Sequence, residues 1–100
     1  MKIVAVTACP TGIAHTYMAA EQLEKTARKL GHAIKVETQG AMGIENELRQ
    51  ADIDAAEVAI LATDIAIEKP ERFDRIRKVQ VPVQAALKDP GAILRQAQAS

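Results

Sequence analysis

The only thiol in the chain, Cys9, stands where a reactive group is expected. It follows the apolar, β-branched run of residues 2–7, which is typical of a strand buried on both faces. A turn and then a helical pattern come after it. Because ligands of open parallel sheets bind outside the carboxyl ends of the strands, we expect Cys9 to be a nucleophile. An isolated cysteine is more often an inert buried residue, but the surrounding strand, turn and helix reverse that preference.

The segment after Cys9 is predicted to form a phosphate-binding loop. Its backbone N–H groups lead into a helix, and the positive end of that helix favours both an anion and the thiolate form of Cys9. Gly12 permits a close approach of the backbone, and threonine hydroxyls add donors. The loop is not a Walker loop, because the ending Gly-Lys-Ser/Thr is absent. The expected phosphate-binding residues are Pro10, Thr11, Gly12, Ile13, Ala14, His15 and Thr16.

Two further side chains each allow two interpretations. His15 lies six positions after Cys9, where cysteine phosphatases of the C-x5-R pattern carry a phosphate-clamping arginine. This histidine either donates to phosphate or holds the loop together. Asp64 ends the third predicted strand, and it either stands behind the reacting groups at the site or caps the next turn.

The elements that position these residues follow from hydrophobic periodicity. Residues 39–43 are predicted to be a loop, and residues 65–73, interrupted by Pro70, fit no single element. The strands are expected at residues 2–7, 32–38, 57–62 and 75–81, and the helices at residues 16–30, 45–56 and 90–98. This order predicts an α/β fold with a four-stranded, mainly parallel sheet flanked by helices on both faces. The phosphate-binding loop would follow the first strand.

Composition narrows the possible classes of protein. One hundred residues suit a single domain, and the formal net charge of zero argues against a nucleic-acid partner. A single cysteine forms no internal disulfide, and no residue cluster calls for a metal or a cofactor. No apolar run approaches the roughly 20 residues of a membrane helix. Residues 1–9 resemble a lipoprotein cleavage site, but their apolar stretch is shorter than the about 7–15 residues that a signal peptide needs.

The residues around Cys9 also resemble a known family. The segment Thr7-Ala-Cys-Pro-Thr-Gly-Ile-Ala-His-Thr-Tyr-Met-Ala-Ala-Glu21 is similar to the active-site segment of the fructose-specific enzyme IIB domain of the bacterial phosphoenolpyruvate-dependent sugar phosphotransferase system (PTS). Further matching segments are Gly31-His32, Val36-Glu-Thr-Gln-Gly40, Gly43-Ile-Glu-Asn-Glu-Leu48, Ala62-Thr-Asp-Ile-Ala66, Glu71-Arg-Phe73 and Leu87-Lys-Asp-Pro90. Residues 1–100 would then form one domain of this type.

The resemblance implies a phosphotransferase whose working residue is Cys9. It implies that this cysteine accepts a phosphoryl group from a phosphohistidine of a IIA component. The group would then pass to fructose, or to a fructose-like sugar, entering through the membrane IIC component. The domain would be cytoplasmic and would associate with the inner face of the membrane through IIC.

Two other classes of protein use the same local features. A low-molecular-weight cysteine phosphatase or an arsenate-reductase-like enzyme would share the cysteine loop. We disfavour both, because His15 replaces the arginine and no clear acid for a leaving group is present. A non-catalytic binding module would be favoured only if Cys9 were missing.

Overall fold

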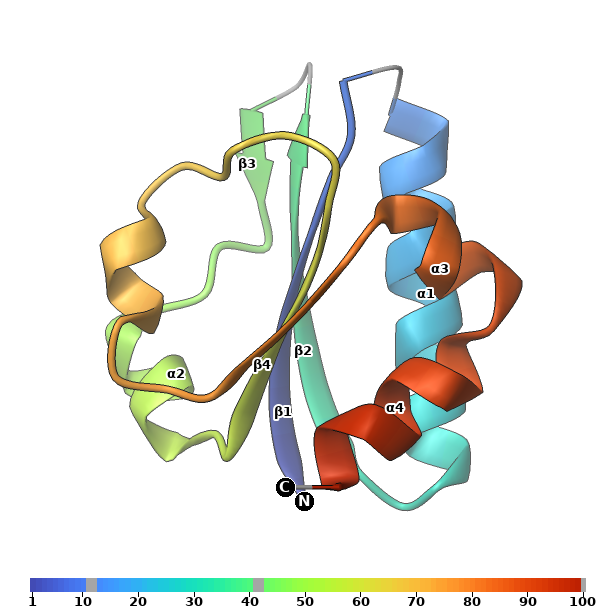
Figure 1. Ribbon diagram of the computed structural model, residues 1–100. Coiled ribbons are helices and arrows are strands. Elements are labelled where there is room, and N and C mark those ends of the chain that lie inside the picture. Colours follow the sequence, from blue (N-terminus) through green and yellow to red (C-terminus); the bar gives the residue numbers. More distant parts are fainter. Residues whose placement is uncertain (11–12, 41–42, 100) are drawn as a thin grey trace.

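A five-stranded sheet forms the centre of the protein (Figure 1). The computed structural model describes residues 1–10, 13–40 and 43–99, and nothing is stated for the side chain of Ile13. The strands are β1 (Lys2–Ala8), β2 (Ala33–Gly40), β3 (Gly43–Glu45), β4 (Val58–Thr63) and β5 (Lys78–Val81). Their order across the sheet is β3-β2-β1-β4-β5, with β3 antiparallel to β2 and the other pairs parallel.

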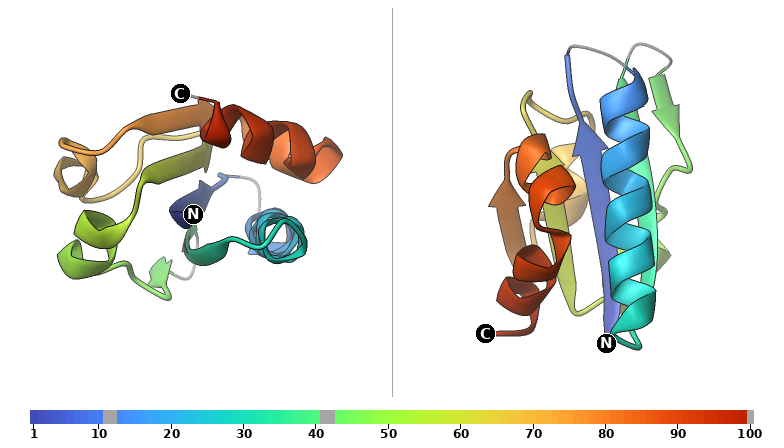
Figure 2. Two further views of the ribbon diagram at one scale, coloured as in Figure 1. Left: turned by 90° about the horizontal axis from the view of Figure 1, so that it is seen from below. Right: turned by 90° about the vertical axis from the view of Figure 1, so that its right-hand side faces the viewer.

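Helices cover both faces of the sheet, as predicted (Figure 2). They are α1 (Ile13–Lys29), α2 (Gln50–Ala55), the 3-10 helix η1 (Pro70–Phe73), α3 (Val83–Lys88) and α4 (Pro90–Gln98). The helices α1, α3 and α4 pack against one another on one face, whereas α2 and η1 lie on the other. The predicted α/β architecture is therefore confirmed.

The central strand β1 is buried on both faces, as its apolar run predicted. Successive side chains of a strand point to opposite faces. Ile3 and Ala5 join the core beneath α1, α3 and α4, while Val4 and Val6 join the core beneath α2 and η1. This double burial fixes β1 in the middle of the sheet and gives the residue that follows it, Cys9, a rigid starting point.

The prediction of four strands was wrong by one short strand, β3. Residues 39–43 were expected to be a loop and Glu45 to begin a helix. Instead, Gly43 pairs with Gly40 and Glu45 pairs with Thr38 in an antiparallel hairpin edge. The Tyr17 hydroxyl donates to the Glu45 carboxylate, which holds this strand to α1. A three-residue strand is too short to show a periodicity, and its partner on α1 is distant in sequence.

The helix boundaries also differ from the predicted ones. α2 begins at Gln50 instead of residue 45, because Asn46 has a left-handed φ of 54° that interrupts a helix. The Arg49 N–H donates to Asp52 Oδ2 at 2.9 Å, so a backbone N–H group at the start of α2 has a hydrogen-bond partner. α1 begins at Ile13 instead of residue 16. It ends before Gly31, whose φ of 83° suits a helix terminus.

Two elements were absent from the prediction. The six-residue α3 follows Pro82 directly, and η1 occupies part of the unassigned segment around Pro70. Both are shorter than the window in which helical periodicity becomes visible. The last helix, α4, was predicted correctly, and the Asp89 carboxylate accepts a hydrogen bond from the Ala92 N–H at 3.1 Å.

The register of the sheet brings three strand ends together. Ala8 of β1 pairs with Gln39 of β2 on one side and with Thr63 of β4 on the other. The Asp64 N–H then donates to the Ala8 carbonyl at 2.9 Å. Cys9 therefore leaves the sheet between the carboxyl ends of its two neighbouring strands.

Candidate functional site

Cys9 lies at the boundary between the core and the surface. It is the first residue after β1 and is 5% exposed. Its side chain belongs to the apolar cluster beneath α1, with Ala19 and Ala20 among the other members. The small alanines leave room for the thiol beside the first turns of that helix. A reaction partner must consequently reach Cys9 through an opening at the end of the sheet.

Such an opening exists at the carboxyl ends of the parallel strands. A cavity of about 370 Å³ is bordered by the segment after β1, the end of β2, the start of β3 and the segment after β4. Its lining residues are Cys9, Pro10, Gln39, Gly40, Gly43, Ile65, Ala66 and Glu68. This is the position at which open parallel sheets bind their ligands. The structure thus brings Cys9 together with residues from two other loops.

The first turn of α1 lies near this opening, because Thr16 borders a small hollow together with Gly40 and Gly43, which also line the Cys9 cavity. A helix leaves its first four backbone N–H groups without intrahelical partners, and the helix dipole places partial positive charge there. In α1 these groups include those of residues 13–15. The Thr7 hydroxyl donates to the Thr16 carbonyl at 3.0 Å, which ties the first turn of α1 to β1. The arrangement can stabilise an anion next to Cys9.

The predicted phosphate-binding residues fall into three groups. Pro10 is exposed and lines the cavity. Ala14 and His15 are exposed in the first turn of α1, whereas Thr16 is buried there, 2% exposed. The predicted residues Thr11 and Gly12 lie outside the described residues, as does the side chain of Ile13. Within the described part of this interval, residues 13–16 belong to the helix and not to a loop.

Asp64 has a definite structural partner. Its Oδ1 accepts a hydrogen bond from the Val83 N–H at 3.1 Å, at the first residue of α3. This bond connects the end of β4 to the start of α3, the helix that follows β5 in the chain. The partner lies in α3 and not in the turn that follows β4, so both interpretations of Asp64 stay predictions.

A buried polar network next to the cavity was missed by the sequence reasoning. Glu37 of β2 is fully buried, and Gln39, two residues later, is 4% exposed. Arg72 of η1 donates to both carboxylate oxygens of Glu37, at 2.8 and 3.0 Å. A glutamate inside a buried strand was the available signal, because a buried carboxylate requires a partner. The sequence could not reveal which cation it meets.

The charge on Glu37 is stabilised by its hydrogen bonds. Burial alone would raise the pKa of this carboxyl group. The hydrogen bonds from Arg72, Gln39 and the Leu48 N–H outweigh burial, and the pKa lies below its ordinary value. Glu37 is therefore ionised at neutral pH and keeps all of its donors in place.

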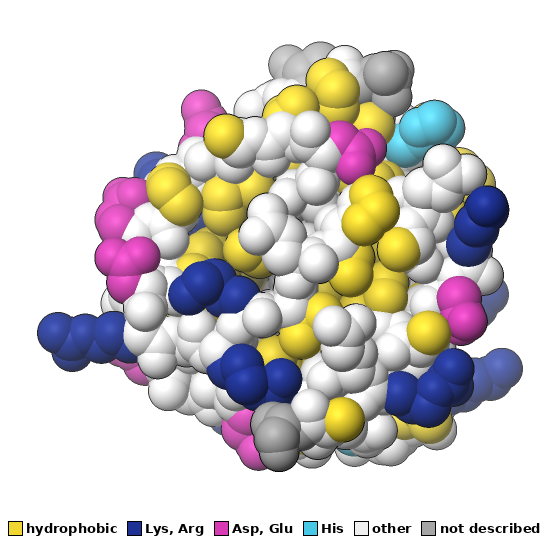
Figure 3. Space-filling model, in the orientation of Figure 1, with side chains coloured by type: hydrophobic (Ala, Val, Ile, Leu, Met, Phe, Trp, Pro, Cys, Tyr) yellow, Lys and Arg dark blue, Asp and Glu magenta, His cyan; other side chains and the backbone are white. Residues whose placement is uncertain are grey.

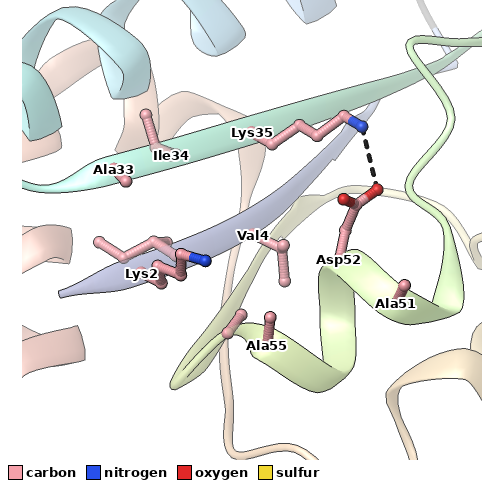
Figure 4. Close-up of a pocket in the computed structure, with 10 residues that line it drawn as sticks. Lys2, Val4, Ala33, Ile34, Lys35, Ala51, Asp52 and Ala55 are labelled. Atoms are coloured by element: carbon pink, nitrogen blue, oxygen red, sulfur yellow. Dashed lines mark hydrogen bonds and ion pairs between the residues drawn. The ribbon is translucent and has the colours of Figure 1, made fainter.

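Another hollow lies at the opposite end of the sheet (Figure 4). It is about 230 Å³ in volume and lies between α2 and the first halves of β1 and β2. Lys35 and Asp52 point toward each other across it and form an ion pair of 2.9 Å. The hollow is distant from Cys9 and from the carboxyl ends of the strands, so it is not part of the candidate site.

The part of the chain that the structure describes contains neither a metal-binding cluster nor a membrane-spanning helix. In that part, no group of three or more His, Cys, Asp or Glu residues could hold a metal ion. No helix formed by the described residues is sufficiently long and apolar to span a bilayer.

Comparison with known proteins assigns the family. The family described as "PTS system, Lactose/Cellobiose specific IIB subunit" matches residues 4–96. The "PTS system fructose-like EIIB component 2" of Escherichia coli is 50% identical over 98 residues, which cover 98% of this chain and 92% of that protein. The chain belongs to the PTS IIB family. Its predicted resemblance to fructose-type IIB domains is confirmed.

A solved structure and a longer relative extend this result. The crystal structure of a domain of the fructose-specific IIABC component of Borrelia burgdorferi superposes on this IIB chain with a TM-score of 0.92. That domain is 47% identical, with 96% of this chain and 91% of the other covered. The "PTS system 2-O-alpha-mannosyl-D-glycerate-specific EIIABC component" of Escherichia coli is 50% identical over 95 residues. These residues cover 95% of this chain but only 14% of that protein, so IIB domains also occur within longer PTS components.

Proposed function

We propose that this IIB chain carries a phosphoryl group on Cys9. The group would come from a phosphohistidine of a IIA component and pass to a fructose-like sugar brought in by a membrane IIC component. The observation that supports this most strongly is the position of Cys9. It follows the central strand, faces a cavity, and stands beside the N-terminal turn of α1. A phosphocysteine formed there would place its oxygens near open N–H groups.

Each transfer exchanges one bond to phosphorus for another. The Cys9 thiolate attacks the phosphorus of the phosphohistidine, an S–P bond forms, and the N–P bond breaks to release the imidazole. In the second transfer a sugar hydroxyl attacks the same phosphorus, the S–P bond breaks, and the thiolate returns while the hydroxyl proton goes to a base. In both steps the open N–H groups at the start of α1, those of residues 13–15, would stabilise charge on the phosphoryl oxygens.

The lining of the cavity favours a carrier over a hydrolase. A hydrolytic cysteine enzyme commonly clamps phosphate with arginine and supplies an acid to the leaving group. Among the described residues that border the cavity there is no lysine, arginine or histidine. His15, in place of the arginine, is exposed on α1. A phosphoryl group held mainly by backbone N–H groups would survive until an acceptor arrives.

The surface around the cavity suits docking of protein partners. Large hydrophobic side chains are exposed at Tyr17, Met18 and Ile65, by 43%, 53% and 41%. Tyr17 and Met18 lie in the second turn of α1, and Ile65 lines the cavity. In Figure 3 hydrophobic side chains surface mainly in the upper part of the view, where β1 and β4 end, while Lys and Arg lie mainly lower. IIA and IIC would dock here in turn.

The sugar is proposed from the names of relatives. The fructose-like EIIB relative favours a fructose-like sugar, although the mannosyl-glycerate component is equally identical. Specificity for the sugar would lie mainly in IIC. Through that component the chain would work at the cytoplasmic face of the membrane.

The decisive experiment is phosphorylation by a phosphorylated IIA partner, followed by intact-mass measurement and peptide mapping. We expect a gain of one phosphoryl group on Cys9, and rapid loss of it when membranes with IIC and fructose are added. Cys9→Ser should abolish the transfer to sugar, while Thr38→Val, a buried change in a neighbouring strand, should not. Rapid spontaneous hydrolysis with turnover of aryl phosphates, and no sugar-dependent release, would instead identify a phosphatase.

A further inference from the structure

The buried Glu37–Arg72 pair links two parts of the chain that are far apart in sequence. Arg72 Nη1 donates to Glu37 Oε1 at 2.8 Å, and Arg72 Nη2 donates to Glu37 Oε2 at 3.0 Å. The Arg72 side chain is 10% exposed and that of Glu37 is fully buried. Paired hydrogen bonds of this kind fix direction as well as distance. The pair therefore fixes η1 relative to β2.

Glu37 in turn fixes the orientation of the Gln39 amide. An ionised carboxylate only accepts hydrogen bonds, so the Gln39 NH2 group must face it. Gln39 Nε2 donates to Glu37 Oε2 at 2.6 Å. The carbonyl oxygen of the same amide, Oε1, is thereby turned the other way, where it accepts from the Glu68 N–H at 2.8 Å. Nε2 also reaches the Glu68 carbonyl at 3.3 Å.

Glu68 belongs to the wall of the Cys9 cavity that follows β4. No backbone–backbone hydrogen bond to another described residue holds residues 65–68. Side chains hold this segment instead: Gln39 bonds both polar groups of the Glu68 backbone, and Arg72 donates to the Glu68 and Lys69 carbonyls at 3.1 and 2.9 Å. Loss of these bonds would free the wall while leaving the sheet intact.

Gln39 is also adjacent to the reacting residue. It pairs in register with Ala8, which precedes Cys9, and it lines the same cavity as Cys9, Ile65 and Glu68. We propose that Gln39 is a positioning residue for phosphotransfer at Cys9, and that its amide sets the distance between this cysteine and the wall of residues 65–68. The inference rests on the proposed phosphocarrier function. Transfer needs a donor or acceptor aligned on phosphorus, and a misplacement of about 1 Å can cost about 100-fold in rate.

The first test is Gln39→Met, which removes both hydrogen bonds to Glu68 while keeping the shape of the side chain. We expect kcat for transfer to sugar to fall by about 10-fold or more. Amide hydrogen exchange at Glu68 should accelerate, whereas exchange in β1 should not. Thr38→Val is the matched control: Thr38 directly precedes Gln39 on β2, is 5% exposed, and its hydroxyl has no hydrogen-bond partner among the described residues. It should leave both measurements unchanged.

The second test is Gln39→Glu, which separates positioning from a loss of stability. The new carboxylate would still face Glu37, and two adjacent carboxylates hold a shared proton more tightly than either alone. Protonation restores a donor toward Glu37. The rate of the variant relative to the unmodified protein should therefore rise as pH is lowered from about 8 to about 6. If Gln39→Met does not fold, the pH dependence of Gln39→Glu alone tests the proposal.

The outcomes are distinguishable. Transfer rates within about twofold of the unmodified protein for both variants, despite faster exchange at Glu68, would overturn the role of Gln39. Failure of the unmodified protein to accept phosphate on Cys9 would instead overturn the proposed function. The proposal is rejected if the loss of transfer rate parallels the loss of stability and the rate of Gln39→Glu relative to the unmodified protein does not change with pH. Gln39 would then have a structural role only.

Discussion

At the scale of single residues, Glu37 shows how a charge can occupy the middle of a buried strand. Four hydrogen bonds reach its carboxylate, from two Arg72 nitrogens, Gln39 and the Leu48 N–H. Removing one partner from a buried ion pair leaves the other charge uncompensated, which costs more than the pair itself contributes. Arg72 also stacks on the Phe73 ring, 5.0 Å from its centroid.

Arg72→Met should consequently be one of the most destabilising single changes outside the apolar core. We expect the free energy of unfolding to fall by about 3 kcal/mol or more, since Glu37 is left buried and unpaired. Urea denaturation followed by circular dichroism measures this. Arg28→Met is the control, because Arg28 pairs with Glu24 on the exposed surface of α1 and should cost less than about 1 kcal/mol. Similar losses in both variants would contradict the argument.

The lowered pKa of Glu37 predicts how stability depends on pH. A carboxyl group with a lowered folded-state pKa contributes stability above its unfolded pKa and loses it as pH falls through the folded value. The unfolded reference is 4.5, so the contribution should be constant at neutral pH and shrink below that value. In urea titrations at several pH values, the free energy of unfolding of Glu37→Gln should fall less steeply below pH 4.5 than that of the unmodified protein. If the free energies of unfolding of the two proteins fall equally steeply at acid pH, other carboxylates cause the acid sensitivity.

At the scale of elements, the long or strongly periodic segments were the predictable ones. β1, α1 and β4 were expected from continuous apolar runs or a helical stripe, and α4 from Asp89-Pro90 as a helix start; all four are present. β3, η1 and α3 have three, four and six residues, too few to display a period. Their conformations depend on distant contacts, such as the Tyr17–Glu45 hydrogen bond and the Asp64–Val83 hydrogen bond.

Helix α1 allows a matched test of partner docking. Met18 near its start is 53% exposed beside the site, and Leu30 just after its end is 49% exposed at the other end of the molecule. Met18→Glu should raise KM for the phosphorylated IIA partner by about 10-fold, as loss of an apolar docking contact of roughly 1.4 kcal/mol would. Leu30→Glu should leave KM unchanged. Equal effects of the two changes, or none, would remove this surface of α1 from the docking site.

At the scale of the whole molecule, half of the site was predictable and half was not. The half formed by Cys9 and the start of α1 is local in sequence, because strand, turn and helix follow one another directly. The half formed by Gln39, Gly40 and the wall of residues 65–68 depends on strand order and register. The sequence around Glu37 does not reveal its partner, because Arg72 lies 35 positions away.

The two ends of the polypeptide lie at the same end of the molecule, away from Cys9 (Figure 1). The Met1 carbonyl accepts from the Ala33 N–H, and Gln98 in the last turn of α4 bonds the His32 ring, so both ends are attached near the start of β2. A tether added at either end would therefore leave the mouth of the cavity unobstructed. Short flexible linkers to a donor domain and an acceptor domain would hold both at local concentrations of about millimolar. Each successive transfer would then be an intramolecular event.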